Sequence, residues 1–274
     1  MKATAFQVPA GYLLRSRDET PALISLLENG ERRELTHAGL YRQVAGLAAA
    51  LRAEGVVAGD RVAGFMPNIP EAVIAMLAAA SIGAIWSSCS PDFGINGVMD
   101  RFGQIAPKVL FAADGYYYSG KTCDSRSRLA EVAERIDSIR RVVVAPVVDA
   151  SPGLGTIRDS VLFGDYLDSG ATTVDFASLP FDHPLYIMYS SGTTGVPKCI
   201  VHGAGGTLLQ HLKEHQLLVD IRPGDRFFYF TTCGWMMWNW LVSGLASAAT
   251  LVLYDGSPFA RDGNLLLDAI DSEG

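Results

Sequence analysis

The sequence predicts an α/β fold in which mostly parallel sheets are covered by helices. Apolar residues recur alternately at helical and at strand spacing along most of the chain. Strands and helices that alternate in this way are joined by right-handed crossovers, which make neighbouring strands parallel and place helices on the faces of the sheet. A length of 274 residues, with 49% hydrophobic and 19% charged residues, is sufficient for a large core.

The first half of the chain contains most of the predicted crossovers. Leu40, Val44 and Leu51 share one face of a helix that follows Thr36, a residue suited to cap a helix N-terminus. Pro70 is suited to the first position of the next helix, 70–81. The other elements predicted here are strands at 61–66, 84–88, 108–113 and 141–148 and helices at 95–104 and 125–138.

The second half continues the pattern after residues 149–183, which show little periodicity. Its predicted elements are strands at 185–189, 199–202, 226–230 and 250–254 and helices at 206–219, 236–247 and from about 264. We therefore predict a first α/β subdomain at 1–180 and the start of a second at 181–274. The last helix presents Leu265, Leu266 and Leu267 with little chain left to cover them, which suggests a truncated chain.

Composition and charge exclude several functional classes. A net charge of -7 argues against nucleic acid as a partner, because acidic neighbours interrupt the arginines. Four well-separated cysteines without a C-x-x-C pair predict neither a disulfide framework nor a zinc site, and they fit a cytoplasmic location. The N-terminus lacks the apolar core of a signal peptide.

Two uncharged stretches, 72–91 and 227–254, are long enough to cross a bilayer, which takes about 20 apolar residues. Gly83 interrupts the first, and residues 231–234 interrupt the second. These breaks favour buried helices and strands, because a spanning helix tolerates such breaks only with partners. A membrane component is therefore the least favoured class.

The most informative segment runs from Tyr189 to Lys198, with the sequence Tyr-Ser-Ser-Gly-Thr-Thr-Gly-Val-Pro-Lys, between two short apolar stretches that we predict to be buried strands. Glycines let backbone N–H groups turn toward an anion, hydroxyls add donors, and a lysine supplies a compact positive charge. We therefore predict a strand-to-strand loop that binds the phosphates of ATP. The predicted contacts are Ser190, Ser191, Gly192, Thr193, Thr194, Gly195 and Lys198.

This segment differs from the strand-loop-helix phosphate loop G-x-x-x-x-G-K-[ST]. In that motif the lysine directly follows the second glycine, whereas here Val196 and Pro197 intervene and Cys199 follows the lysine. A surface turn without a ligand is the alternative, because turns in general favour glycine, serine and threonine.

His211 and His215 belong to an H-x-x-E-H motif, in which two histidines one helical turn apart can bind zinc. Leu208 and Leu212 form the apolar stripe of the same helix, so we expect both histidines to face solvent on its flank. An exposed polar face is the commoner outcome of such a pattern. We predict no metal ligand in this chain.

Two further segments are candidates for a ligand pocket. Residues 234–240 contain three indoles, which suit either a core or the wall of an apolar pocket, and their place soon after the loop favours the pocket. Residues 87–94 are a serine-rich turn between a strand and a helix, where ligands bind in open α/β folds. A serine-rich turn without a ligand is equally compatible.

The segment from Tyr189 to Lys198 resembles the phosphate-loop signature of the adenylate-forming superfamily, which contains acyl-CoA synthetases, luciferases and adenylation domains of peptide synthetases. Within it, segments 86–94, 188–198 and 232–240 are together similar to the acetoacetyl-CoA synthetase family, and the similarity runs from about Leu13 to Asp268. The resemblance implies the N-terminal portion of the large domain of the adenylate-forming fold.

The resemblance also implies an AMP-forming acid–thiol ligase that uses ATP, Mg²⁺ and CoA. The carboxylate of acetoacetate would attack the ATP α-phosphate to give acyl-adenylate and pyrophosphate, and the thiol of CoA would then displace AMP. Lys198 and the loop donors would stabilise the departing pyrophosphate. The acyl-pocket segment of acetyl-CoA synthetase aligns with Trp235, Met236, Met237 and Trp238, and an indole N–H there could recognise the keto oxygen.

A segment that contacts the CoA nucleotide in the relative aligns with Tyr118, Ser119, Gly120 and Lys121. The relative has arginine where Tyr118 stands here, so Lys121 is the remaining charge.

The family's adenine-, ribose- and magnesium-binding motifs, and its C-terminal lid with the catalytic lysine, have no counterpart here. We therefore assign no catalytic residue and expect this polypeptide alone to be weak or inactive as a ligase. An acetyl- or propionyl-type acyl-CoA synthetase and a non-catalytic folded fragment stay as alternatives. The sequence specifies no oligomeric state.

Overall fold

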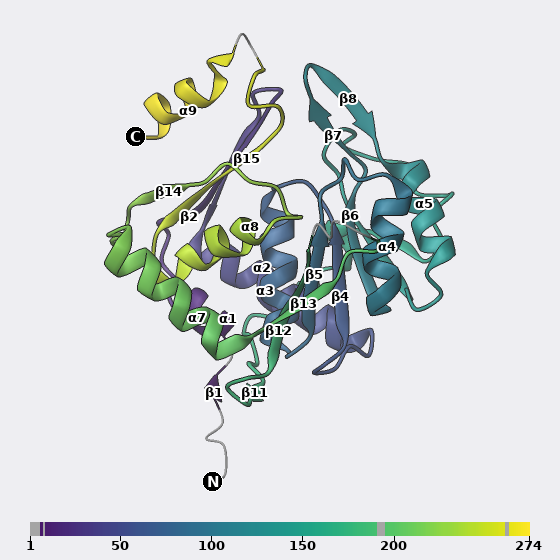
Figure 1. Ribbon diagram of the computed structural model, residues 1–274, viewed down its shortest axis with the longest axis horizontal. Helices are drawn as coiled ribbons and strands as arrows, with labels where there is room; N and C mark the ends of the chain where they lie inside the picture. Colours follow the sequence, from purple (N-terminus) through teal and green to yellow (C-terminus); the bar gives the residue numbers. More distant parts are fainter. Residues whose placement is uncertain (1–5, 8, 191–194, 261–262) are drawn as a thin grey trace.

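The computed structural model describes residues 6–7, 9–190, 195–260 and 263–274 (Figure 1). Its two larger sheets share one hydrophobic core. The first sheet has seven strands in the spatial order β10 (Ser160–Leu162), β9 (Arg141–Ala145), β6 (Val109–Ala113), β4 (Arg61–Phe65), β5 (Ile85–Cys89), β12 (Pro184–Tyr189) and β13 (Cys199–Gly203). The second has four strands in the order β14 (Arg226–Phe228), β15 (Thr250–Asp255), β2 (Pro21–Leu27) and β3 (Arg32–Thr36).

Smaller elements complete the described chain. Two short antiparallel pairs are β1 (Phe6–Gln7) with β11 (Ser178–Leu179) and β7 (Gly115–Tyr118) with β8 (Lys121–Asp124). The helices are α1 (Pro9–Leu13), α2 (His37–Ala53), α3 (Pro70–Ser81), α4 (Ile95–Ile105), α5 (Arg126–Arg135), α6 (Phe163–Tyr166), α7 (Ala204–Lys213), α8 (Met236–Val242) and α9 (Leu265–Glu273). A π-helix at Glu214–Leu218 continues α7, and a 3₁₀ helix at Ser243–Ser247 continues α8.

Helices cover both faces of the seven-stranded sheet, as the alternating pattern predicts. Its strands are parallel except β13, which runs antiparallel to β12 at one edge. Val62 and Phe111 belong to the core cluster that includes α2 and α3, whereas the adjacent Ala63 and Leu110 belong to the cluster that includes α4 and α5. Successive residues of a strand point to opposite faces, so one apolar run supplies both cores.

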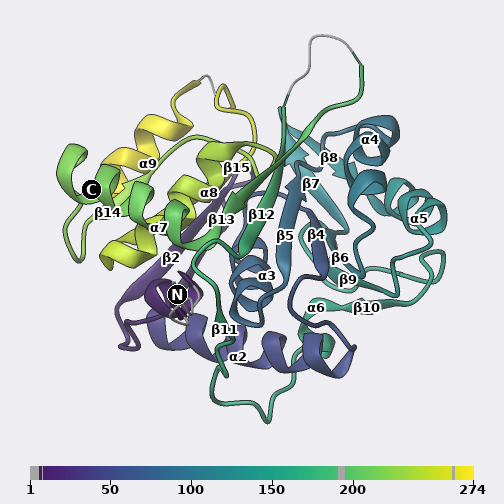
Figure 2. The ribbon, with the colours of Figure 1, turned by 60° about the horizontal axis from the view of Figure 1, so that its bottom comes forward.

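The helical layer between the two sheets joins them into one body. Helix α3 packs on β4 and β5, while α2 packs on α3 and on the β2–β3 hairpin (Figure 2). Strand β2 pairs with β15, with Leu23 beside Leu251, so the N-terminal hairpin β2–β3 joins two strands from near the other end of the chain in one sheet. Each of the two larger sheets therefore contains strands from before and after residue 180. The division into subdomains 1–180 and 181–274 stays a prediction.

Several predicted elements differ in detail. The hairpins β2–β3 and β7–β8 were not predicted, and the predicted helix 206–219 changes to a π-helix after Lys213. The prediction that 199–202 is a buried strand is wrong, because β13 is the last strand of its sheet and Ile200 and Val201 are exposed.

Gly64 leads to a prediction about packing between β4 and β5. A Cβ atom at Gly64 would lie 2.5 Å from Cη2 of the buried Trp86, whereas a Cβ at Gly206 in α7 would meet nothing within 4 Å. We expect Gly64→Ala to lower the free energy of unfolding by about 1–3 kcal/mol, because the indole must shift within a packed core. Gly206→Ala should raise it by about 0.5–1 kcal/mol, because alanine restricts the unfolded chain and favours the helix. Urea denaturation of both variants, followed by circular dichroism, measures the contrast, and equal effects would contradict it.

Candidate active site

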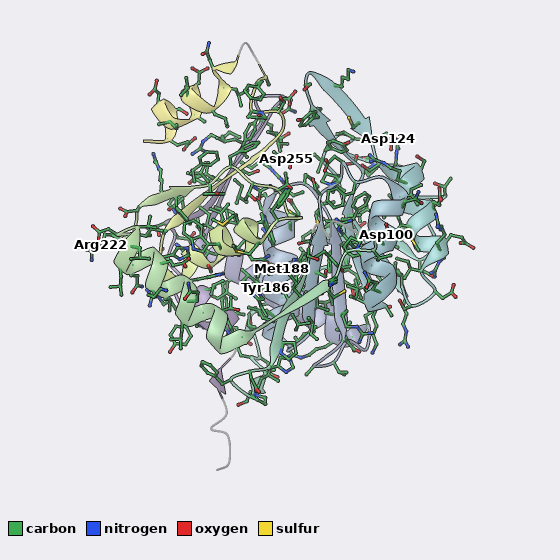
Figure 3. All side chains as sticks on the ribbon, in the orientation of Figure 1. Asp100, Asp124, Tyr186, Met188, Arg222 and Asp255 are labelled. Atoms are coloured by element: carbon green, nitrogen blue, oxygen red, sulfur yellow. The ribbon has the colours of Figure 1, made fainter. Side chains whose placement is uncertain are left out.

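The candidate site lies where the carboxyl ends of strands from both sheets meet. Residues 66–69 follow β4, the serine-rich turn follows β5, Ser190 follows β12, and Asp255 ends β15. Tyr186, Met188 and Asp255 lie in this central region in Figure 3. Ligands bind outside the carboxyl ends of strands in open α/β sheets, so this edge is where the predicted segments should converge.

The predicted phosphate loop connects β12 to β13 and is closed at its base. The N–H of Ser190 donates to the carbonyl of Lys198 at 3.0 Å, and the N–H of Lys198 donates to Oγ of Ser190 at 3.2 Å. Gly195 has φ +98°, in the region that favours glycine. Lys198 is exposed and, among the described residues, its side chain makes no ion pair. The predicted contacts Ser191, Gly192, Thr193 and Thr194 lie outside the described residues.

Neighbouring elements hold both ends of this loop. The amide of Gln104 on α4 donates to the carbonyl of Pro197 at 2.8 Å. The hydroxyl of Ser87 on β5 bonds with the hydroxyl of Tyr189 at 2.8 Å. The loop therefore begins and ends at fixed points of the seven-stranded sheet and its covering helix.

The serine-rich turn contacts the tryptophan segment. Oγ of Ser88 accepts the indole N–H of Trp86 at 3.2 Å and donates to the carbonyl of Cys233 at 2.7 Å. A Cβ at Gly234 would lie 3.3 Å from the backbone nitrogen of Ser90, so glycine permits the close approach there. The structure thus brings together two segments that the sequence singled out separately.

The tryptophan segment divides into exposed and buried residues. Trp235 is 63% exposed and Met236 is 43% exposed, whereas Trp238 is 0% exposed and stacks on Trp86 with 6.4 Å between ring centroids. The indole N–H of Trp238 donates to Oδ1 of Asn68 at 2.9 Å. Trp238 is therefore part of the core and its N–H is already engaged by the protein, whereas the pocket wall at the exposed Trp235 and Met236 stays a prediction.

Asn68, which sequence reasoning missed, connects three segments at this edge. Its backbone N–H donates to Oδ2 of Asp255 at 2.7 Å, and its amide donates to the carbonyl of Tyr254 at 3.3 Å. Burial raises the pKa of Asp255 to about 7, even though the hydrogen bond from Asn68 favours the ionised form. No local pattern marks Asn68, because its partners lie far away in the sequence.

The segment predicted to contact CoA forms the turn between β7 and β8. Ser119 and Gly120 have φ +51° and +75°. The carboxylate of the buried Glu28 accepts their backbone N–H groups, at 3.0 Å from Ser119, and it also accepts the N–H of Ser257. The backbone donors of this turn are therefore occupied, and the exposed side chains of Tyr118 and Lys121 are the groups it presents to a ligand.

The prediction that His211 and His215 face solvent is wrong. Both are buried, His211 in α7 and His215 at the start of the π-helix. The centroid of the His215 ring lies 4.6 Å from that of Trp240 and 5.3 Å from that of Phe227. Nδ1 of His211 bonds with Oγ of Ser243 at 2.8 Å. Neither ring nitrogen of His215 makes a well-aligned hydrogen bond, although the Trp240 backbone is close. The part of the chain that the structure describes contains no group of three or more metal-binding side chains.

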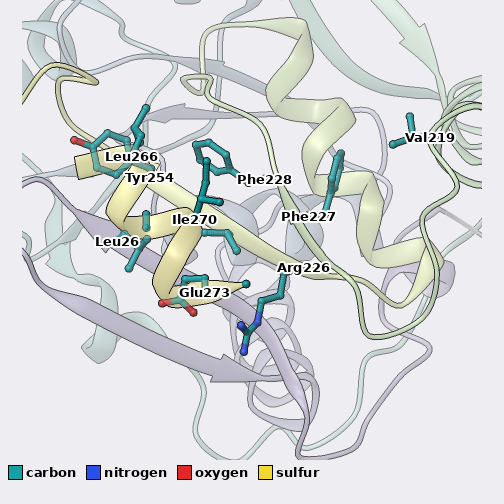
Figure 4. Close-up of a pocket in the computed structure, with 12 residues that line it drawn as sticks. Leu26, Val219, Arg226, Phe227, Phe228, Tyr254, Leu266, Ile270 and Glu273 are labelled. Atoms are coloured by element: carbon teal, nitrogen blue, oxygen red, sulfur yellow. The ribbon is translucent and has the colours of Figure 1, made fainter. Parts of the chain in front are cut away.

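An apolar cavity of about 350 Å³ lies elsewhere, between α9 and the strands β2, β14 and β15 (Figure 4). Leu26, Phe228 and Ile270 line it, with Arg226 and Glu273 at one end. None of the residues predicted to bind a ligand lines it, so we do not assign it to the site. No helix among the described residues is long and apolar enough to cross a membrane.

The fold and a match to a known family define the class of this protein. Residues 14–274 match the family described as AMP-binding enzyme, and the chain belongs to that family. It is 55% identical over 266 residues to the acetoacetyl-coenzyme A synthetase of Rhizobium meliloti (strain 1021), covering 96% of this chain and 41% of that protein. It is 49% identical over 273 residues to the acetoacetyl-CoA synthetase of Mus musculus, covering 97% and 41%.

Two further relatives extend the comparison. A malonamoyl-CoA synthetase of Penicillium aethiopicum is 46% identical over 249 residues, covering 88% of this chain and 34% of that protein. The solved structure of acetoacetyl-CoA synthetase from Streptomyces lividans aligns with a TM-score of 0.87 and 48% identity, covering 92% of this chain and 38% of that chain. The predicted fold and family are confirmed, and the chain spans about two fifths of the length of the two acetoacetyl-CoA synthetases from Rhizobium meliloti and Mus musculus.

The buried ionisable groups predict opposing pH dependences of stability. Burial lowers the pKa of His215 to about 4, below its value of about 6.5 in an unfolded chain, so the folded state loses stability as the pH falls from 6.5 toward 4. Asp255 behaves oppositely, because its pKa is raised to about 7 and the folded state loses stability as the pH rises from 4 toward 7. A pKa shift of this size, for either group, changes the free energy of unfolding by on the order of 3 kcal/mol.

Two variants separate these contributions. Relative to the unchanged protein, His215→Phe should gain stability as the pH is lowered, and Asp255→Asn should gain stability as the pH is raised. Urea denaturation at several values between about pH 4.5 and 7.5 gives both slopes. Slopes of the same sign for the two variants would contradict the assignment of these groups.

Proposed function

We propose that this chain is the part of an AMP-forming acid–thiol ligase that binds the pyrophosphate end of ATP and the acyl group, and that the acid is acetoacetate. The observation that carries the proposal is the convergence of the loop base at Ser190 and Lys198 with the serine-rich turn and the tryptophan segment. The acetoacetyl-CoA synthetases among the relatives support the choice of acid.

The chemistry of the first step needs positioning and charge neutralisation more than a reactive side chain. The acid carboxylate attacks the α-phosphorus of ATP, the bond to the bridging oxygen breaks, and pyrophosphate leaves with the added negative charge. Lys198, at the fixed base of the loop, neutralises part of that charge. The positive φ of Gly195 lets the backbone turn its N–H groups toward the phosphates. The thiol of CoA then displaces AMP from the acyl-adenylate.

Magnesium and CoA are further requirements of the proposed reaction. None of the described residues forms a metal-binding cluster, so we assign none of them to Mg²⁺, which commonly keeps waters and binds substrate phosphates with one or two carboxylates. For CoA we propose Lys121 and Tyr118 as contacts, with Ser119 and Gly120 shaping the turn. We also propose a cytoplasmic location, which suits the four free cysteines.

The activities for which the relatives are named also favour a β-carbonyl acid over a simple alkyl acid such as acetate or propionate. Acetoacetyl and malonamoyl groups both carry a carbonyl two atoms from the activated carbonyl, and they differ only in the group beyond it. This shared feature suggests that the site recognises the second carbonyl oxygen.

Lys198 provides the direct test of the ATP site. We expect Lys198→Gln to weaken binding of MgATP or of magnesium pyrophosphate about tenfold, since hydrogen bonds to charged groups contribute about 1.5–3 kcal/mol. Isothermal titration calorimetry of the 274-residue chain measures the affinity. Lys213→Gln on α7 is the matched control, because it removes the same charge at an exposed position away from the loop. Equal losses in both variants would indicate general charge attraction and contradict a phosphate site at Lys198.

A further inference from the structure

The turn between β7 and β8 belongs to a hairpin that lies outside the two large sheets. Among the described residues, these two strands pair only with each other. An isolated two-stranded hairpin is only marginally stable in water. Ser119 in the turn also has φ +51°, a conformation that costs free energy for a residue with a Cβ atom. The tip of this hairpin therefore needs an anchor elsewhere in the protein.

Glu28 is the residue that holds this tip. It is only 6% exposed, and among the described residues it takes part in no ion pair, so hydrogen bonds must compensate for the burial of its charge. Its carboxylate accepts the backbone N–H of Ser119 at 3.0 Å and that of Gly120. It accepts a third N–H at 2.6 Å, from Ser257 in the loop after β15. One carboxylate thus joins two segments that are far apart in the sequence.

These two segments are walls of one open groove of about 660 Å³. Tyr118 lines it from the turn, and Phe259 lines it from the loop after β15. Both rings are well exposed, Tyr118 at 50% and Phe259 at 82%. Oγ of Ser257 accepts the N–H of Phe259 at 3.3 Å, so the bond from Ser257 to Glu28 also holds the segment that carries this ring. Glu28 lines the groove as well, so its carboxylate sets the separation of the two walls.

The backbone of Glu28 fixes both walls relative to the candidate active site. Its N–H donates to the carbonyl of Asp255 at 3.0 Å. The carboxylate of Asp255 accepts the N–H of Asn68, whose side chain holds Trp238. A Cβ atom at Gly256 would lie 2.5 Å from Cβ of Glu28, so glycine permits this close approach. The groove and the tryptophan segment are therefore connected through consecutive hydrogen bonds.

We propose that Glu28 is a positioning residue for the CoA step, because its carboxylate holds the two walls of the groove at the separation in which Tyr118 and Lys121 meet CoA. It acts through the backbone of the turn and of the loop after β15, and it does not itself bind CoA. The inference rests on the proposed function, which assigns Tyr118 and Lys121 to CoA.

Charge and position predict opposite effects of replacing Glu28. CoA carries several negative charges, so a nearby carboxylate repels it, and by charge alone Glu28→Gln would strengthen CoA binding. By position it would weaken binding, because the amide NH₂ of glutamine cannot accept the backbone N–H groups and one wall is released. A released wall must be ordered again when CoA binds, which lowers the affinity. The sign of the change therefore separates the two effects.

Isothermal titration calorimetry of the 274-residue chain measures this sign. We expect Glu28→Gln to weaken CoA binding about tenfold and to leave MgATP binding unchanged. Glu31→Gln is the matched control, because it removes the same charge at an exposed position of the same β2–β3 hairpin, and it should not weaken CoA binding. Unchanged or tighter CoA binding in Glu28→Gln would overturn the positioning role. Equal losses for CoA and MgATP would show a general structural defect and would also overturn it.

Amide hydrogen exchange tests the anchor in the unchanged protein, so the test holds even if Glu28→Gln does not fold. Ser119 and Gly120 are exposed residues of a turn, whose amide protons exchange fast unless they are hydrogen-bonded. We expect the amide protons of Ser119, Gly120 and Ser257 to exchange at least about tenfold more slowly than unprotected amides. They should lose this protection together in Glu28→Gln. Fast exchange at Ser119 and Gly120 in the unchanged protein would rule out the anchor.

A Lys121→Gln variant separates this inference from the proposed function. CoA binding that depends on Lys121 but not on Glu28 overturns the inference and leaves the proposed CoA contact intact. Binding that depends on Glu28 but not on Lys121 supports the positioning role and counts against the proposed contact. Absence of CoA binding to the unchanged chain overturns both.

Discussion

The geometry of the site depends on the hydrogen bonds made by the side chain and the backbone N–H of Asn68. Asn68 lies in the loop after β4, and its three polar groups bind the Trp238 indole, the Tyr254 carbonyl and the Asp255 carboxylate. The first belongs to the tryptophan segment and the other two to the end of the four-stranded sheet. The hydrogen bonds of Asn68 therefore help to fix the distance between the carboxyl ends of the two sheets, together with the bond from Ser88 to the carbonyl of Cys233, whereas the apolar contacts between the layers specify position less strictly.

The hydrogen bond between Asn68 and Trp238 explains why neighbouring residues of the tryptophan segment differ in burial and in role. Trp238 is buried against Trp86 and bound to Asn68, so it forms a rigid support, whereas Trp235 precedes the helix and stays exposed. Asn239 follows on the supported side, where it is buried and its Oδ1 has no hydrogen-bond partner among the described residues. Preorganisation of this kind lowers the entropic cost of binding, because the protein groups are already ordered before the ligand arrives.

Sequence reasoning recovered what depends on local pattern and missed what depends on distant partners. The parallel strands and the helices around β4, β5 and β6 follow from periodicity that is visible within each segment. The pairing of Leu23 with Leu251 joins strands from opposite ends of the chain, so no local signal indicates it. The burial of His215 has the same cause, since Trp240 and Phe227 cover it after a π-helical turn that residue spacing does not predict. Within the site, residue types indicated the phosphate loop and the tryptophan segment, whereas the roles of Asn68 and Glu28 required the fold.

The two segments predicted to bind anions differ in how their backbone donors are paired. At the turn between β7 and β8, Glu28 takes the backbone N–H groups, so the turn is rigid but its own donors cannot reach a phosphate. At the loop after β12, the paired atoms of Ser190 and Lys198 form the base, and the lysine ammonium stays available because the pairing uses its backbone. In a chain of net charge -7, an anionic ligand needs such a local positive group to overcome the surrounding field. The position of Lys198 on a paired backbone, and not its charge alone, is therefore what supports the proposal of a pyrophosphate site at this loop.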